Sequence, residues 1–264
     1  MNTELAVARA AAEAAGLAIR ARWDQGIEVR HKGEIDLVTE ADLISESIIV
    51  DRLRGAFPAD AVVAEEGGGH AAKGSRTWYV DPLDGTTNFS HGMPQFAVSI
   101  GLADDLGLRL GVVHAPVYGW TFHAVRGEGA WLEGRRLRGG RARRLDEALL
   151  ATGFPYDRQA RPRHNVDRFG HLLERCQGVR RAGSAALDLA FVAAGWFDGY
   201  WEDRLQPWDL AAGCLLVTEA GGALTAFDGG RADFLSGAVV ASNGHVHVEL
   251  LRALAEARGE QPES

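Results

Sequence analysis

Residues 78–89, with the sequence WYVDPLDGTTNF, constrain the fold of this chain more than any other segment. Residues 77–80 are aromatic or β-branched, which favours a buried strand. Pro82 cannot donate a hydrogen bond to a neighbouring strand, so we expect the strand to end near Asp81. Asp81 and Asp84 therefore fall at the carboxyl end of a strand, where the turning chain can bring both carboxylates to one point.

The chemistry of this segment suits a metal ion and a phosphate group. Two neighbouring carboxylates repel each other, and a divalent cation between them removes the conflict. Gly85 allows a close approach of the backbone to a ligand. Thr86 and Thr87 add hydroxyls and amides where a helix could start, which favours an anion. A strand followed by an ordinary Asp-Gly turn would explain the Asp-x-x-Asp spacing alone, so the prediction depends on the longer string.

Two further acidic segments are candidates for the same site. Glu65 and Glu66 follow a short apolar strand at residues 61–64 and precede three glycines. Asp42 comes three residues after Thr39 at the start of a predicted helix, where a capping role alone explains it. An exposed acidic loop would equally explain the glutamate pair. Because two successive strand ends carry carboxylates, we expect a shared metal cluster.

A second informative segment covers residues 206–222. Pro207 fits the first turn of a helix and a Gly-Gly pair marks its end, which places Asp209 in the first turn. The helix dipole and free amides there favour an ionised aspartate, a hard oxygen ligand suited to Mg²⁺. A Gly-Ser-Ala turn at residues 183–185 opens another predicted helix and could meet an anion or a polyol, although N-capping by Ser184 also explains it.

Composition restricts the class of protein. With 264 residues the chain can form one large domain or two small ones and bury a core without disulfides. A net charge of −8 argues against nucleic acid as the main partner, and a solvated connector explains the arginine-rich run at residues 135–144. No apolar run approaches the roughly 20 residues of a membrane span, and no signal peptide is evident. Two cysteines suit a reducing cytoplasm, where we expect the protein.

The chain resembles the inositol monophosphatase family of metal-dependent, lithium-sensitive phosphatases from end to end. Three blocks carry the likeness: residues 32–42, residues 65–89 and residues 207–222 with WDLAAG. The resemblance implies an α/β fold, an αβαβα layered sandwich like that of fructose-1,6-bisphosphatase. It also implies one domain over residues 1–264, with subdomains 1–144 and 145–264 as an alternative division, and a homodimer.

The family pattern implies roles for individual residues. The implied metal ligands are the side chains of Glu65, Asp81, Asp84 and Asp209 and the backbone carbonyl of Leu83. The implied phosphate contacts are Gly85, Thr86 and Thr87, and the groups that activate water are Glu65, Thr86 and Asp42. The implied contacts to a sugar or polyol are Gly183, Ser184, Ala185 and Glu202, and Lys32 falls on a loop that closes over the site.

The resemblance implies a phosphomonoesterase that uses two or three Mg²⁺ ions to hydrolyse inositol 1-phosphate or a similar polyol phosphate. Relatives with the same core hydrolyse fructose 1,6-bisphosphate, histidinol phosphate or 3′-phosphoadenosine 5′-phosphate, and these stay open as alternatives. The segments at 200–202 and 207–209 favour the inositol branch. Some relatives bind the transcription machinery, a non-enzymatic role that only the arginine-rich run would favour here.

Overall fold

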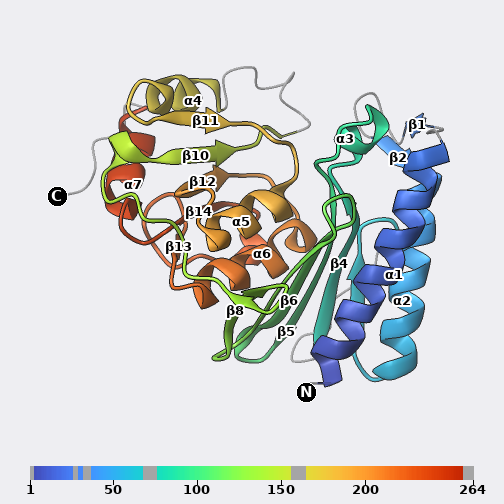
Figure 1. Ribbon diagram of the computed structural model, residues 1–264. Helices are drawn as coiled ribbons and strands as arrows, with labels where there is room; N and C mark the ends of the chain where they lie inside the picture. Colours follow the sequence, from blue (N-terminus) through green and yellow to red (C-terminus); the bar gives the residue numbers. More distant parts are fainter. Residues whose placement is uncertain (1–2, 26–28, 32–36, 68–75, 156–164, 258–264) are drawn as a thin grey trace.

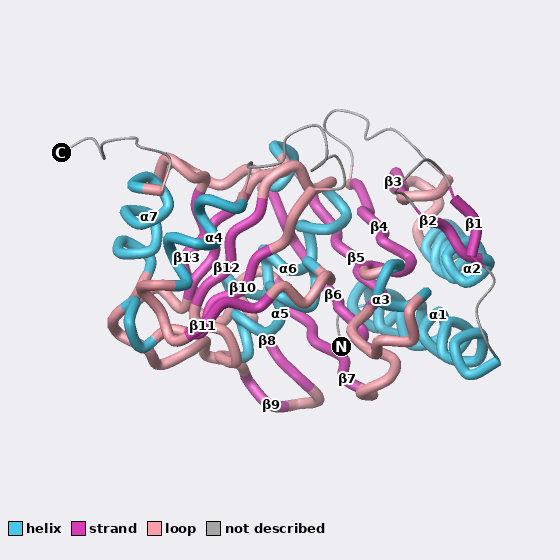
Figure 2. Tube along the Cα trace, turned by 90° about the horizontal axis from the view of Figure 1, so that it is seen from above, coloured by secondary structure: helices cyan, strands magenta, loops and turns pink. Residues whose placement is uncertain are grey.

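The computed structural model describes residues 3–25, 29–31, 37–67, 76–155 and 165–257, with the side chains of all of these except 29–31 and 37–39. They form alternating layers of helix, sheet, helix, sheet and helix, which Figure 1 shows edge-on. Figure 2 shows the same layers from above, with the first two helices at one end and α7 at the other. The αβαβα sandwich expected from the sequence is confirmed.

The first sheet is a meander preceded by one parallel strand. β4 (Thr77–Asp84) pairs parallel with β3 (Ala61–Ala64) and antiparallel with β5 (Ala97–Asp104). The next strands pair in sequence order: β6 (Gly107–Ala115), β7 (Trp120–Val125), β8 (Gly129–Leu132) and β9 (Arg135–Arg136). Because β3 and β4 are parallel neighbours, their carboxyl ends meet at one edge of the sheet, as the shared acidic cluster requires.

The second sheet has the strand order β11-β10-β12-β14-β13. Its strands are β10 (Leu149–Thr152), β11 (Gly178–Arg180), β12 (Gly199–Glu202), β13 (Ala223–Thr225) and β14 (Val239–Ser242). β10 is parallel to β11 and β12, whereas β14 is antiparallel to β12 and β13. The chain passes between the sheets after β9, near the predicted boundary at residue 144. The division of the chain into domains stays a prediction.

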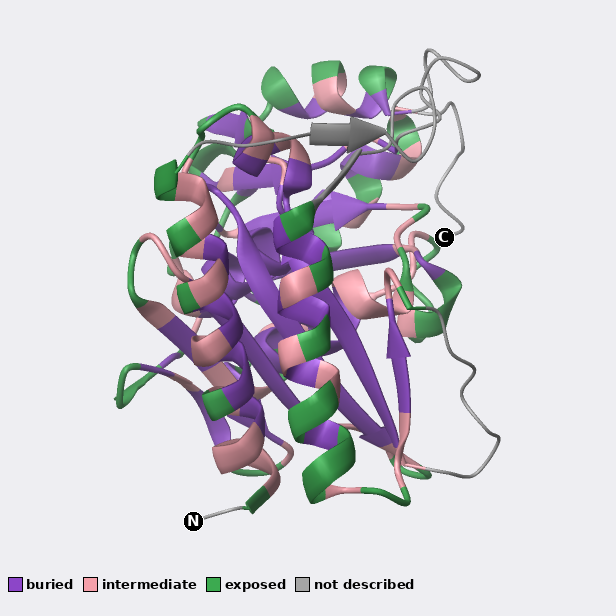
Figure 3. Ribbon diagram, turned by 90° about the vertical axis from the view of Figure 1, so that its right-hand side faces the viewer, coloured by how far each residue is buried: buried purple, intermediate pink, exposed green. Residues whose placement is uncertain are grey.

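The outer helices cover the two outward faces of the sheets. α1 (Thr3–Gln25) and α2 (Glu40–Ala56) lie on the first sheet, with their buried faces inward and their exposed faces outward in Figure 3. α4 (Val166–Leu173) and α7 (His247–Glu256) pack together beside the second sheet. None of the described helices is long and apolar enough to cross a bilayer.

The middle layer consists of α5 (Ala185–Ala194) and α6 (Pro207–Glu219). α6 packs against the first sheet at very close range, because a Cβ atom on Gly111 of β6 would lie 2.7 Å from the backbone oxygen of Ala212. Gly213 allows α5 to approach equally closely, since a Cβ there would lie 2.6 Å from Leu189. The small residues around Asp209 therefore bring the start of α6 up to the first sheet.

One sequence expectation needs correction. β4 does not end near Asp81 but continues past Pro82 to Asp84. Its pairing with β5 shifts register between Asp81 and Asp84, so Pro82 lies in an irregularity where no ladder hydrogen bond is needed. The short helix α3 (Thr86–Ser90) begins directly afterwards. Two small strands, β1 (Val29–His31) and β2 (Leu37–Thr39), form a separate antiparallel pair.

Candidate active site

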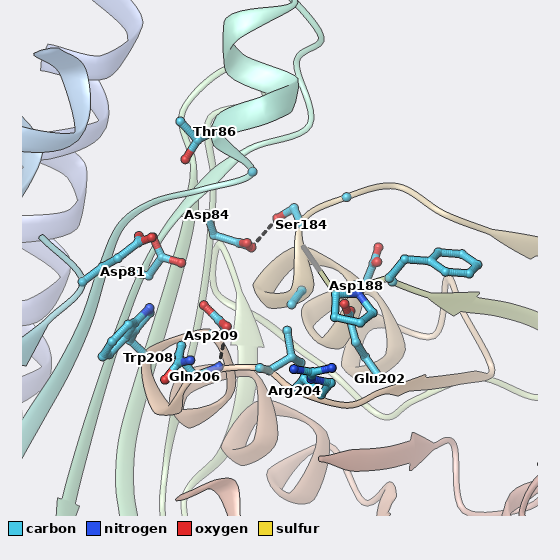
Figure 4. Close-up of a pocket in the computed structure, with 18 of the residues that line it drawn as sticks. Asp81, Asp84, Thr86, Ser184, Asp188, Glu202, Arg204, Gln206, Trp208 and Asp209 are labelled. Carbon is cyan, nitrogen blue, oxygen red and sulfur yellow. Dashed lines mark hydrogen bonds between the residues drawn. The ribbon is translucent and has the colours of Figure 1, made fainter. Parts of the chain in front are cut away.

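The end of β4 supplies two of the predicted acidic residues. Asp81 is 3% exposed and Asp84 is 9% exposed. The Leu83 amide donates to Asp81 Oδ1 at 2.9 Å, which holds this carboxylate in the irregular part of the strand. Figure 4 shows the Asp81 and Asp84 side chains facing the same pocket. The register shift thus turns two residues that are three positions apart toward one space.

The middle layer closes the pocket from the other side. Asp84 Oδ2 accepts a hydrogen bond from the Ala186 amide at 2.8 Å and one from the Ser184 hydroxyl, both at the start of α5. Asp209, in the first turn of α6, accepts from the Gln206 amide at 2.7 Å. The predicted N-cap at Ser184 is confirmed, because its side chain accepts from the Leu187 amide. Three elements therefore converge on the acidic cluster.

Burial and mutual repulsion dominate the electrostatics of this cluster. Desolvation, followed by repulsion from Glu65, Asp84 and Asp209, raises the pKa of Asp81 well above its usual range. Desolvation raises the pKa of Asp84 to about 6, although hydrogen bonds from the start of α5 oppose the shift.

Asp209 corrects a second expectation. Desolvation, with repulsion from Asp84, raises its pKa to about 7 and outweighs the amide of Gln206. The first-turn position predicted an ionised aspartate, but burial beside other carboxylates has the larger effect. Positive charge near Asp209 would return it to the ionised form.

Two side chains of α2 contact the segment of β4 and α3 that carries Asp81 and Asp84. Thr86 donates to the Leu83 carbonyl at 3.0 Å, and its hydroxyl lies 3.3 Å from Oδ1 of the fully buried Asp42. Ser45 of the same helix donates to the Pro82 carbonyl at 2.7 Å. One turn of α2 therefore fixes both the irregular end of β4 and the threonine that follows it.

The turn at Gly85 depends on glycine and on a clamp that the sequence analysis missed. Gly85 has φ of 94°, and a Cβ atom there would lie 2.8 Å from the Gln95 carbonyl. The Asn88 side chain donates to the carbonyls of Gln95 and Ala182, at 2.7 and 2.8 Å, and to that of Gly183 at 3.2 Å. Asn88 thereby ties the turn after β4 to the turn before α5. The sequence signal that could have identified Asn88 was its position near the end of the motif WYVDPLDGTTNF.

A pocket of about 480 Å³ unites most of the predicted residues. The predicted residues in its lining are Glu65, Asp81, Leu83, Asp84, Gly85, Thr86, Gly183, Ser184, Ala185, Glu202 and Asp209. Asp42 lies behind Thr86, and Thr87 is outside the lining. Lys32 lies outside the described residues. The pocket also includes side chains that the sequence analysis did not single out, among them Arg181, Asp188, Arg204 and Trp208.

Glu202 lies at the end of the pocket away from Asp81 (Figure 4). Its Oε2 accepts a hydrogen bond from the Tyr200 hydroxyl. Desolvation raises the Glu202 pKa to about 7, and both the Tyr200 hydrogen bond and the charge of Arg181 oppose this shift. A Cβ atom on Gly153 would lie 2.1 Å from this carboxylate, so the glycine leaves room for Glu202. Glu202 therefore has a fixed position in the pocket wall.

The donor set fits a hard divalent cation. At the end of the pocket that contains Asp81, Asp84 and Asp209, the polar groups are carboxylate and carbonyl oxygens, which Mg²⁺ prefers. As the described side chains stand, no three Asp, Glu, His or Cys groups converge closely enough to bind one ion together. Burial and repulsion among the carboxylates raise the pKa of Asp81 and that of Asp209. A divalent cation between them would remove this repulsion.

The described histidines do not enter the acidic cluster. His114 contacts the Thr121 hydroxyl at 3.0 Å. His247 lies 2.9 Å from both the Ser242 and the Thr225 hydroxyl. Both histidines therefore contact hydroxyl groups outside the pocket.

The fold and this pocket together define a layered α/β protein whose site suits metal-assisted phosphate chemistry. The chain belongs to the inositol monophosphatase family, whose family model matches residues 1–260. It is 43% identical to inositol-1-monophosphatase of Synechocystis over 97% of this chain and 90% of that protein. It is equally identical to Nus factor SuhB of Salmonella typhimurium over 93% of both chains.

The solved structures agree with this membership. The inositol monophosphatase from Anabaena (Nostoc) superposes with a TM-score of 0.88 at 40% identity, over 96% of each chain. The family resemblance drawn from the motifs is therefore confirmed, and membership supports a phosphatase activity.

Proposed function

We propose that this protein is a Mg²⁺-dependent phosphomonoesterase that hydrolyses inositol 1-phosphate and similar polyol phosphates. The observation that carries the proposal is the convergence of Asp81, Asp84 and Asp209 in one pocket beside the Gly85 turn. This pocket has acidic oxygen ligands at one end and a wall of hydrogen-bonding side chains at the other. Such a division suits a ligand with a phosphate group and a hydroxylated body.

The metal end would use Glu65, Asp81, Asp84, Asp209 and the Leu83 carbonyl to hold two or three Mg²⁺ ions. Bound Mg²⁺ would neutralise the phosphate charge and lower the pKa of a coordinated water. The raised pKa values of Asp84 and Asp209 support this assignment, because a buried acidic cluster that resists ionisation gains most from a nearby cation.

The protein groups around the phosphate would orient the reacting partners. The backbone of Gly85 and Thr86 would bind the phosphate oxygens, and the amide of Thr87, in the first turn of α3, would assist them. The Thr86 hydroxyl, which lies 3.3 Å from Asp42, would hold the attacking water together with Glu65 and pass its proton toward Asp42. Phosphoryl transfer depends chiefly on such positioning and on charge stabilisation, so no covalent nucleophile is required.

The opposite wall would recognise the alcohol part of the substrate. We assign this role to the turn of Gly183, Ser184 and Ala185 and to Glu202, all of which line the pocket. We also assign Lys32, outside the described residues, to a loop that covers the site. A homodimer and the cytoplasm are part of the same proposal and can be checked by sedimentation and by cell fractionation.

The test is phosphate release with Mg²⁺ and with EDTA in its place. Inositol 1-phosphate, fructose 1,6-bisphosphate, histidinol phosphate and 3′-phosphoadenosine 5′-phosphate would be compared at equal concentration. We expect Mg²⁺-dependent release that is fastest from inositol 1-phosphate and is inhibited by Li⁺. Faster release from another of the four would keep the mechanism and change the substrate. No release from any of them would contradict the proposal.

A second candidate function is binding to the transcription machinery. Relatives named Nus factor SuhB suggest it, and a groove lined by arginines on this chain favours it. The exposed arginines of this groove are Arg135, Arg136, Arg138, Arg141 and Arg143. Changing these five to glutamate should abolish capture of transcription components in a pull-down while phosphate release continues. Equal capture by both proteins would exclude this groove as the binding site.

A further inference from the structure

Asp188 is a buried carboxyl group in an otherwise apolar helix. It lies in the first turn of α5, where its amide donates to the Ser184 carbonyl at 3.0 Å. The sequence of this helix, AALDLAFVAA, contains no other charged residue. Asp188 is 1% exposed, and its side chain belongs to the lining of the pocket. Figure 4 places it beside Glu202, at the end of the pocket away from Asp81.

Oδ1 of Asp188 has no hydrogen-bond partner among the described residues. A buried polar atom without a partner is destabilising by more than an ordinary hydrogen bond stabilises, so folded proteins contain few of them. The nearby turns do not relieve this atom: the Ser184 hydroxyl is engaged with Asp84 and the Leu187 amide with Ser184. Because the Asp188 side chain belongs to the pocket lining, a group bound in the pocket would supply the missing partner.

The surroundings of Asp188 restrict the kind of partner. Glu202 and Asp84 repel its negative form, and only the charge of Arg181 opposes them. A second phosphate at this end of the pocket would face Glu202 and Asp188 together. A hydroxyl group instead supplies a hydrogen-bond donor without adding charge, and this is the group that a buried acidic wall can bind at lowest cost.

We propose that Asp188 is a specificity-determining residue whose Oδ1 binds one hydroxyl of a polyol phosphate, next to the hydroxyl bound by Glu202. The inference rests on the proposed phosphatase function and deepens it. Two adjacent acidic groups at one end of the pocket select an alcohol with neighbouring hydroxyls and disfavour an ester with a second phosphate there. Asp188 acts in recognition, whereas the acidic cluster around Asp84 acts on the phosphate.

The experiment compares two substrates and three variants in the presence of Mg²⁺. Inositol 1-phosphate carries the hydroxyls, and 4-nitrophenyl phosphate carries none. The variants are Asp188→Ala, Asp188→Asn and, as a matched charge control, Asp105→Asn in the exposed turn between β5 and β6. We expect Asp188→Ala to lower kcat/KM for inositol 1-phosphate about tenfold or more, with little change for the aryl ester. Asp105→Asn should affect neither substrate.

The outcomes separate the two proposals. If the unaltered protein hydrolyses neither ester, the proposed function fails and this inference fails with it. If the unaltered protein hydrolyses both esters, the comparison tests the role of Asp188 alone. That role is overturned if Asp188→Ala keeps full activity toward both esters, or loses activity toward both equally. Deoxy analogues of inositol 1-phosphate provide a measurement that needs no variant. Removal of either of two neighbouring hydroxyls should lower kcat/KM of the unaltered protein. The inference would be overturned if removal of no hydroxyl changed kcat/KM.

Two further readouts distinguish recognition from a structural role. Asp188→Ala and removal of the partner hydroxyl from the substrate should each lower kcat/KM. The two losses should not add when combined, because both changes delete the same contact. The melting temperature of Asp188→Asn without ligand should equal or exceed that of the unaltered protein, because the change removes the repulsion of Asp188 by Glu202 and Asp84. A residue kept for structure would give a lower melting temperature and additive losses.

Discussion

Asp84 and Ser184 are hydrogen bonded to each other although 100 positions separate them in the chain. Asp84 ends β4 of the first sheet, and Ser184 caps α5 in the middle layer. The Ala186 amide donates to the same carboxylate oxygen at 2.8 Å. This contact joins the acidic end of the pocket to the wall that would bind the alcohol, so a change at either residue should affect both.

Ser184→Ala removes the hydroxyl from Asp84 and also the cap of α5. We expect the free energy of unfolding to fall by about 1–3 kcal/mol. The Mg²⁺ concentration needed for half-maximal activity should rise about 10-fold or more, because Asp84 loses the group that orients it. Urea unfolding and Mg²⁺ titration of activity measure the two effects. Ser236→Ala, in an exposed turn, is the matched control, and an unchanged Mg²⁺ requirement in Ser184→Ala would contradict the orienting role.

Asp84→Asn replaces one proposed metal ligand by a neutral amide of the same shape. Phosphate release should fall by about 100-fold or more, because the cluster loses charge where the cation would bind. The protein should stay folded, since the substitution also relieves repulsion of Asp81 and Asp209. Phosphate release and circular dichroism check the two parts. Near-normal turnover in a folded variant would remove Asp84 from the metal site.

Asn88→Ala tests the clamp between the Gly85 turn and the Gly183 turn. The variant leaves the Gln95 and Ala182 carbonyls without their donor, which should lower the free energy of unfolding by about 2 kcal/mol. Activity should fall further than this loss explains, because both turns line the pocket. Asn243→Ala is the matched control, since Asn243 is equally buried and donates to the Ala142 carbonyl far from the site. Equal losses of activity in the two variants would argue against a special role for Asn88.

The buried acidic groups predict how stability depends on pH without metal. The pKa of Asp209 and that of Glu202 are raised to about 7, and that of Asp84 to about 6. Unfolded carboxyl groups titrate near pH 4. Between pH 4 and pH 7 the folded protein therefore holds protons that the unfolded chain has lost, so these groups make the free energy of unfolding fall as pH rises.

Buried histidines act in the opposite direction, which sets the design of the measurement. Burial lowers the pKa of His114, His123 and His247, so their contribution to stability rises with pH. Comparison with Asp209→Asn under metal-free conditions isolates the acidic groups. The variant should gain stability relative to the unaltered protein as pH rises from 5 to 8, by about 1 kcal/mol or more. Added Mg²⁺ should reverse the ranking at pH 8, and a constant difference at all pH values would refute the assignment.

The local motifs predicted the elements well where side-chain chemistry alone decides them. The N-cap at Ser184 and the helix start at Pro207 were both expected and are both present. The strand ending at Asp81 was wrong, because a proline at a register shift sacrifices no ladder hydrogen bond. That compensation involves β5, a partner that the local sequence does not identify.

The charge state of Asp209 and the proposed role of Asp188 could not be predicted from local sequence either, because both depend on residues that are distant in the chain. A first-turn aspartate in isolation favours the ionised form, but Asp209 is buried beside Asp81 and Asp84. Asp188 had one signal in the sequence, since it is the sole charged residue of an apolar helix. Only the packing of β12 against α5 shows that this carboxyl group lies next to Glu202.

The sequence by itself determined the family and the residues of the acidic cluster, because these depend on residue types at fixed spacings along short segments. The αβαβα order of layers followed only from the family resemblance. The tertiary structure alone decided which of those residues share a pocket, which of them resist ionisation, and which buried group lacks a partner. The physical reason is that burial and electrostatic repulsion act between residues that are close in space. In this protein the interacting pairs are separated by up to 128 positions, as with Asp81 and Asp209.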